Sequence, residues 1–270
     1  MDLIGHLSVL CLAEVLTPDE AFGDAVIAGM FPNFFHCHEW GYDELLAAGP
    51  DCDDGTPRAV QGHLITDWVI HFGERWARSR QRIGFAYEVM DAASAEMGWF
   101  FAEAESRGLL VRPEALQAKS DERLHRDFAH TAVECAFERL VAERHFGDEH
   151  LPRLREAMRS ALAPERMAAL QSEVFADMAA WTKEPPTMLE RSRGEYAAWL
   201  DIVDSLTDFP ALLFDSKFGV VQSPDGVVLA EELFSRVRRA TDAARFWRCF
   251  DECVAAVAEP AILYARVESA

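Results

Sequence analysis

The segment from Gly62 to Phe72 constrains the fold more than any other part of the chain. Apolar residues fill nearly every face of it, yet His63, Asp67 and His71 recur at intervals of four residues. At about 100° per residue, this spacing places the three polar side chains on one stripe of a helix. Burying an unpaired carboxylate costs several kcal/mol, so the stripe needs a partner inside the protein. We expect that partner to be a metal ion.

Spacing also limits how these residues can share an ion. About 12 Å of helix rise separates His63 from His71, which is near the limit at which two imidazoles could close on one ion. We therefore expect either two ions with Asp67 bridging them, or one ion held by two of the three residues. The alternative without a metal is a helical interaction protein in which these groups are merely paired core residues.

A second helical segment carries His130 and Glu134, again four residues apart, with Asp127 one turn earlier on the same side. Taken alone, such a pair is usually a surface ion pair. Two helices that each present a ligand pair can also face each other and form a shared cage, as in di-metal helical bundles. Mixed imidazole and carboxylate ligands favour zinc, manganese or iron, so we expect one or two such divalent ions.

Helical spacing of apolar residues extends over most of the 270 residues, while the alternation typical of strands is nearly absent. The sequence predicts a single all-α domain, a multi-helix bundle with a metal-binding core over 1–147 and a helical extension over 148–270 packed on it. Turn residues between short β-branched runs predict a hairpin or lid near 208–228. The expected helices cover about 3–15, 17–29, 59–78, 82–107, 123–145, 151–162, 164–182, 188–206 and 230–258.

Charge and hydropathy narrow the choice of partners. The chain has 26 Lys and Arg against 46 Asp and Glu, which gives a formal charge of −20. A surface this negative repels nucleic acid and anionic membranes, so neither is an expected partner. The start of the chain lacks the basic region of a signal peptide, and no apolar run approaches the roughly 20 residues of a membrane span. We expect a cytoplasmic protein that acts on a small molecule.

Other residues are candidates for substrate contacts and proton transfer. Arg75 and Arg78 follow the first metal helix and could clamp a substrate phosphate or carboxylate, although a solvated helix end explains them as well. Asp127, or His36 in a loop, could act as general acid or base. The chain has no nucleophile elbow, Walker loop or dinucleotide fingerprint. Metal-assisted chemistry is therefore the main enzymatic option.

The first residues, MDLIGHL, together with LAE at 12–14 and GD at 23–24, resemble the start of the acyl-carrier-protein phosphodiesterases. These are metal-dependent helical proteins distantly related to HD-type phosphohydrolases. The stripe on 62–72 is similar to an H-x3-D-x3-D element of that family, with His71 in the last place, and the His130 helix is similar to its later D-x3-D helix. The resemblance covers about residues 1–147 and implies that His6 and Asp24 join the metal site.

Zinc-dependent phospholipase C-like proteins offer a second resemblance. They carry an H-x3-D helix, a nearby His and a later H-x3-E helix, and residues 29–33 are similar to their Pro-Asp turn, with Asn33 for Asp. Both resemblances imply a metal-dependent phosphoesterase. An acidic carrier protein would be repelled by this chain, so we expect a small soluble phosphoester as substrate. A non-haem iron oxygenase, possibly di-iron, is the alternative, because these ligands suit iron as well.

Overall fold

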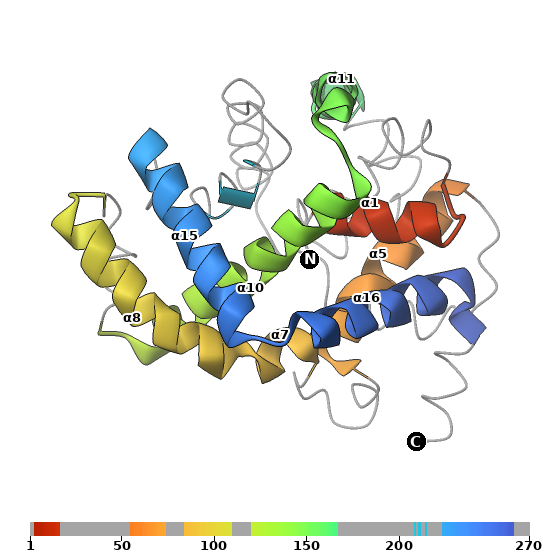
Figure 1. The fold of residues 1–270 in the computed structure, drawn as a ribbon. Coiled ribbons are helices and arrows are strands. Elements are labelled where there is room, and N and C mark those ends of the chain that lie inside the picture. Colours follow the sequence, from red (N-terminus) through yellow and green to blue (C-terminus); the bar gives the residue numbers. More distant parts are fainter. Residues whose placement is uncertain are drawn as a thin grey trace.

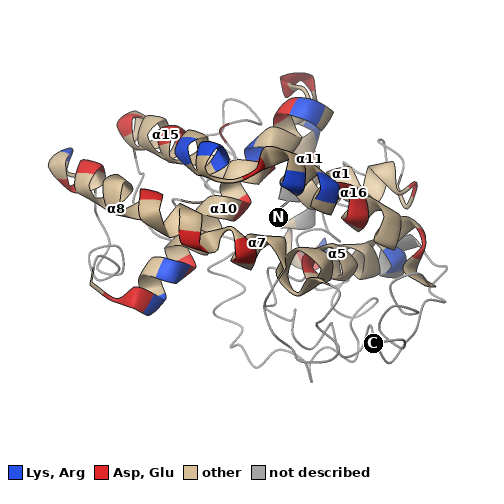
Figure 2. Cartoon of the chain, turned by 60° about the horizontal axis from the view of Figure 1, so that its bottom comes forward, with Lys and Arg blue, Asp and Glu red and all other residues tan. Residues whose placement is uncertain are grey.

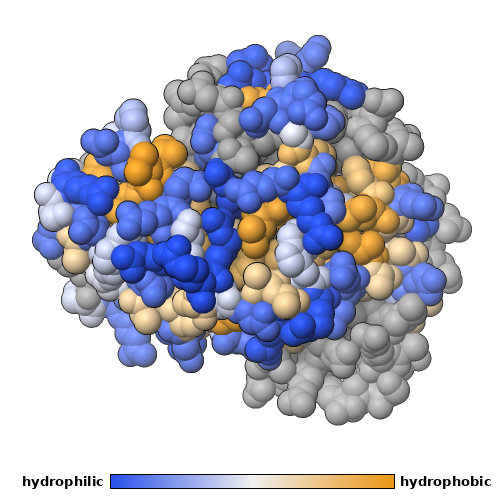
Figure 3. All heavy atoms as spheres, viewed as in Figure 1, coloured by the Kyte–Doolittle hydropathy of each residue, from blue (hydrophilic) through white to orange (hydrophobic). Residues whose placement is uncertain are grey.

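The computed structural model describes residues 3–16, 55–73, 84–109, 120–166 and 223–261, together with positions 208, 210, 211 and 214. Within this part of the chain the structure is helical and contains no strands, which confirms the all-α prediction. None of the described helices is long and apolar enough to cross a membrane. Hydrophilic residues cover much of the described face in Figure 3, and acidic and basic residues are interspersed on α8, α11 and α15 in Figure 2.

Helix α10 (Glu122–His145) is the longest described helix and lies at the centre of the molecule (Figure 1). The Asp121 carboxylate caps its N-terminus by accepting hydrogen bonds from the backbone N–H groups of Arg123 and Leu124. Its buried face packs against α8 (Met90–Ser106) and α15 (Pro224–Ala240). These three helices form one half of the described core.

Helix α5 (Gly55–His71) is the centre of the other half, where it packs against α1 (Leu3–Leu12) and α16 (Ala243–Ala258). The helices approach closely at Gly62. A Cβ atom there would lie 2.4 Å from Leu10 Cδ2 and 3.1 Å from Val257 Cγ1. The missing side chain at Gly62 therefore lets α1 lie directly against α5, one residue before His63.

The two halves meet along α1, α10 and the short helix α7 (Phe85–Glu88), which contacts both α5 and α10. Aromatic side chains fill this junction. Phe137 of α10 stacks on Phe246 of α16 with ring centroids 4.2 Å apart, and Phe85 of α7 meets the edge of Phe137 at 5.1 Å. Such pairs contribute about 0.5–1.5 kcal/mol each beyond their burial, so the junction is a packed part of the core.

Two expected helices are divided in the structure. The helix expected over 82–107 is α7 and α8 separated at Val89, and the one expected over 230–258 is α15 and α16 separated at Thr241. Asp242 starts α16 as its N-cap, with its carboxylate 2.9 Å from the N–H of Ala244. The remaining short helices, η2 (Asp148–His150) and α11 (Leu151–Ala161), follow α10.

Residues 224–228, which we expected in the hairpin or lid, are helical instead and form the first turns of α15. Ser223 is the N-cap, and its hydroxyl accepts a hydrogen bond from the N–H of Gly226 at 3.2 Å. Pro224 follows at the start of the helix, where its fixed φ is favourable. Most of the remaining 208–223 segment lies outside the described residues, as do the helices expected over 17–29 and 188–206 and most of the one over 164–182.

Candidate metal centre

His6, His63 and Asp67 form a first cluster of side chains that could hold a metal ion, and we call it the closed cluster. Helix α1 supplies His6, and α5 supplies the other two residues one turn apart. His6 Nε2 lies 3.2 Å from Asp67 Oδ1, and His63 Nε2 lies 3.4 Å from Asp67 Oδ2. The two imidazole rings stack with centroids 3.7 Å apart. Their exposed fractions are 0% for both histidines and 2% for Asp67, so the cluster is shielded from water.

His71, His130 and Glu134 form a second cluster, which we call the open cluster. His71 is the last residue of α5, and the other two lie one turn apart on α10. His71 Nε2 lies 3.0 Å from Glu134 Oε1, and His130 Nδ1 lies 3.5 Å from Glu134 Oε2. The side chains are 10–19% exposed. The open cluster thus joins the two halves of the core and reaches the surface.

Tyr87 of α7 packs against both imidazoles of the open cluster. Its ring stacks on that of His130, with centroids 4.9 Å apart, and meets His71 edge-on at 6.1 Å. These contacts restrict the rotation of the two histidines, as outer-shell groups do around metal ligands. The sequence gives no indication of this role, because Tyr87 is far from both histidines along the chain and only the tertiary fold brings it to them.

The two clusters are neighbours, because His71 Nδ1 lies 3.9 Å from Asp67 Oδ1. Asp67 therefore faces three imidazoles, two in its own cluster and one in the next. His63 and His71 belong to different clusters, which is the arrangement that their separation along the helix favours. A centre with one ion in each cluster would use Asp67 as the group between them.

Both clusters have the dimensions of a metal site. In each, one ligand atom from every residue can be chosen so that all lie within 4.8 Å of one another. Ligands on one tetrahedral ion with bonds of about 2.0–2.1 Å lie about 3.3 Å apart, and the four donor–donor contacts within the clusters span 3.0–3.5 Å. Each set holds two imidazoles and one carboxylate, a combination found with catalytic zinc and with non-haem iron. The residues present could thus hold one ion per cluster.

Glu138 connects the two helices that carry His6 and Glu134. It is fully buried on α10, one turn after Glu134, and both of its carboxylate oxygens lie 3.0 Å from the backbone N–H of Gly5. A carboxylate at the first turn of α1 also interacts favourably with the helix dipole. Glu138 therefore fixes the position of α1, and with it His6, relative to α10. Sequence spacing places Glu138 on the correct side of α10 but cannot reveal this contact.

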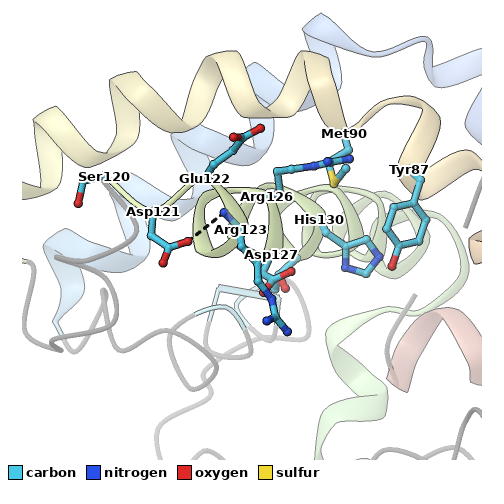
Figure 4. A pocket seen from close by; sticks show the side chains of 10 residues that line it. Tyr87, Met90, Ser120, Asp121, Glu122, Arg123, Arg126, Asp127 and His130 are labelled. Carbon is cyan, nitrogen blue, oxygen red and sulfur yellow. Dashed lines mark hydrogen bonds between the residues drawn. The ribbon is translucent and has the colours of Figure 1, made fainter.

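A pocket of about 860 Å³ lies beside the open cluster (Figure 4). Tyr87 and His130 form one end, and Ser120 and Asp121 the other. Asp127, expected as a general acid or base, is among the lining residues. The complete lining consists of Tyr87, Met90, Ser120, Asp121, Glu122, Arg123, Arg126, Asp127, His130 and Thr131.

Two arginines in this lining, Arg123 and Arg126, did not emerge from the sequence analysis. Neither forms a salt bridge within the part of the chain that the structure describes. They precede His130 by seven and four residues, so helical spacing places them on its side of α10. Applying the i, i+4 rule to His130 in the N-terminal direction would have found Arg126. The residues expected to contact substrate, Arg75 and Arg78, lie outside the described residues, as do Asp24 and His36.

No family model, curated protein or solved structure matches the chain. The resemblances to acyl-carrier-protein phosphodiesterases and to zinc-dependent phospholipase C-like proteins therefore stay predictions.

Proposed function

We propose that the protein is a metal-dependent phosphoesterase that acts on a small soluble phosphoester, with zinc, manganese or iron bound at the open cluster. One observation carries this proposal: two imidazoles and a carboxylate meet at the end of a pocket that also contains two arginines. A metal site alone would suit many functions. A metal site beside two arginines that form no salt bridge with the described residues, in a chain with a charge of −20, favours an anionic substrate.

His71, His130 and Glu134 would supply three protein ligands, and an ion held by three ligands would keep a coordination position for water or substrate. A divalent ion there lowers the pKa of bound water and neutralises charge on phosphoryl oxygens. Glu134 contacts both imidazoles of the cluster, and Tyr87 packs on them, so the ligands are held in place before substrate arrives.

The pocket offers groups for the rest of the reaction. Arg126 lies one turn before His130, about 6 Å along the axis of α10, and Figure 4 shows its side chain extended toward Met90. Its planar guanidinium suits bidentate contact with phosphoryl oxygens. Asp127, three residues before His130, is placed to exchange a proton with the leaving group or with water.

The test is hydrolysis of bis(p-nitrophenyl) phosphate and p-nitrophenyl phosphate by metal-free protein reconstituted with zinc, manganese or iron. We expect metal-dependent turnover that falls at least about 100-fold in Glu134→Gln, which removes a charged ligand while keeping its shape. His150→Ala removes a histidine outside both clusters and should retain full activity. No turnover with any of the three metals, or equal turnover in Glu134→Gln, would refute the proposal.

A second candidate is a non-haem iron oxygenase, because the ligand set suits iron as well as zinc. Two histidines and one carboxylate with open positions are the ligands typical of iron(II) oxygenases. Elemental analysis after aerobic and anaerobic purification separates the candidates. Iron together with an oxygen-dependent absorbance change supports the oxygenase, whereas zinc or manganese with phosphoester turnover supports the hydrolase. Protein that retains no metal and turns over neither substrate supports an interaction protein.

A further inference from the structure

We infer that the closed cluster is a separate, structural metal site, whose ion exchanges slowly and ties α1 to α5. The ion of the open cluster, by contrast, exchanges freely through the pocket. This inference goes beyond the proposed function, because it requires no particular reaction at the open cluster.

The arrangement of donor atoms in the closed cluster suits a structural ion. Asp67 faces ring nitrogens of two imidazoles that stack on each other, with Oδ1 3.2 Å from His6 Nε2 and Oδ2 3.4 Å from His63 Nε2. A carboxylate that uses both oxygens, together with two imidazole nitrogens, supplies four donors. Four protein donors complete the coordination that zinc adopts in structural sites and leave no position for a substrate.

The two clusters also differ in their access to solvent. The three residues of the closed cluster are at most 2% exposed, and none of them lines the pocket beside the open cluster. Leu7, which follows His6 on α1, and Ile65, which lies between His63 and Asp67 on α5, are also fully buried. Open-cluster residues, in contrast, are 10–19% exposed, and His130 lies in the pocket wall. An ion can leave the closed cluster only when α1 separates from α5, so its release is coupled to local unfolding.

The donors of the closed cluster come from two helices that are far apart in the sequence. His6 belongs to α1, a helix of ten residues, whereas His63 and Asp67 belong to α5. An isolated helix this short is marginal in water, so α1 depends on its contacts with the rest of the protein. An ion shared by both helices adds its binding free energy to the folding free energy. Metal removal from this cluster should therefore lower thermal stability.

The experiment uses the full-length variant His130→Ala, which disables the open cluster and leaves the closed cluster intact. Wild type and variant are loaded with zinc and dialysed against EDTA, and retained zinc is measured by elemental analysis. We expect one zinc per chain to remain in both proteins until they are unfolded. Wild type should bind a second equivalent before dialysis and lose it, whereas His130→Ala should never bind it.

A thermal melt tests the structural role. His130→Ala should melt at least about 5 °C higher with zinc than after metal removal in denaturant and refolding without metal. Adding His63→Ala to this variant should abolish the increase, and adding His150→Ala should leave it unchanged. If the His63→Ala protein does not fold, the zinc content and melting temperature of His130→Ala alone decide the question.

The inference is refuted if EDTA-dialysed His130→Ala retains no zinc, or if its melting temperature is the same with and without zinc. Either result leaves the proposed phosphoesterase untouched, because that activity is measured on wild type with metal in the buffer. Conversely, a zinc-retaining protein without phosphoesterase activity would refute the proposed function and support this inference.

Discussion

Asp67 is the residue that contacts histidines of both clusters. Its carboxylate lies 3.2 Å from His6, 3.4 Å from His63 and 3.9 Å from His71, and it is almost fully buried. A buried carboxylate with three imidazoles around it needs hydrogen-bond donors or positive charge nearby, supplied either by the N–H groups of the histidines or by a metal ion. If a metal ion supplies this charge, removing the charge of Asp67 should also remove the ion.

Asp67→Asn keeps the size of the side chain and removes its charge. We expect the variant to lose the EDTA-resistant zinc, because an amide is a poor ligand for zinc compared with a carboxylate. Asp91→Asn, an exposed acid in the first turn of α8, is the matched control and should retain the ion. Equal zinc retention in Asp67→Asn and wild type would show that Asp67 is a paired core residue rather than a ligand.

Arg126→Gln tests the anionic character of the substrate. A hydrogen bond to a charged group contributes about 1.5–3 kcal/mol, so kcat/KM for bis(p-nitrophenyl) phosphate should fall about tenfold or more. Metal content should not change, because Arg126 is not part of either cluster. Arg248→Gln removes an equal charge from an exposed position on α16 outside the pocket lining and should have no effect. Unchanged kcat/KM in Arg126→Gln would exclude a role for this arginine in binding.

His145, at the end of α10, gives the molecule a pH dependence unrelated to the metal centre. Burial lowers the pKa of its imidazole below 6.5, and the neighbouring Arg144 lowers it further, while Asp251 acts in the opposite direction. Because the unfolded chain binds the proton more readily, the stability that depends on neutral His145 is complete above about pH 6.5 and declines as the pH falls through the lower folded value. Denaturant unfolding at about pH 7.5 and 5.5 should show a smaller loss of stability in His145→Gln than in wild type. An equal loss in both would contradict this assignment.

At the scale of elements, sequence periodicity predicts the ends of α10 and α11 to within one residue, whereas α5 begins at Gly55 rather than at the expected residue 59. Helices α5 and α10 each carry polar residues at four-residue spacing, and these residues lie in the two clusters. The same side of α10 also carries Arg126 and Asp127.

The hairpin predicted near 208–228 is wrong for residues 224–228, where the local sequence signals conflict. Val227 and Val228 favour a strand, yet Ser223 and Pro224 form a helix start, and the helix start determines the structure.

The position of α5 relative to α7 depends on Gly84, whose N–H donates a hydrogen bond to the carbonyl of His71 at 2.8 Å. A Cβ atom at Gly84 would lie 2.2 Å from the carbonyl oxygen of Ile70, which is backbone and cannot move aside easily. We expect Gly84→Ala to destabilise the protein by about 1–3 kcal/mol and to weaken zinc binding at the open cluster, because the end of α5 must shift.

Gly98→Ala is the matched control for this prediction. Gly98 is exposed in the middle of α8, and a Cβ atom there would have no neighbour within 4 Å. Alanine has the higher helix propensity, so this substitution should stabilise the protein by up to about 1 kcal/mol. Denaturant unfolding measures both variants. If Gly84→Ala proves as stable as Gly98→Ala, the contact between Gly84 and the end of α5 is not required.

At the scale of the whole molecule, the two clusters that could hold metal ions lie where the two halves of the core meet. The closed cluster belongs to the half built around α5, and the open cluster connects that half to α10. Periodicity can assign each ligand to a helix face, but it carries no information about which faces meet. The contribution of Tyr87, the contact between Glu138 and Gly5, and the pocket along α10 all depend on this packing. They became apparent only in the folded structure.

The most direct test of this account is anomalous X-ray scattering from crystals of zinc-loaded protein, measured on both sides of the zinc absorption edge. The account predicts two anomalous peaks, one among His6, His63 and Asp67 and one among His71, His130 and Glu134. Histidines and carboxylates in direct contact, with no anomalous peak at either cluster, would contradict it.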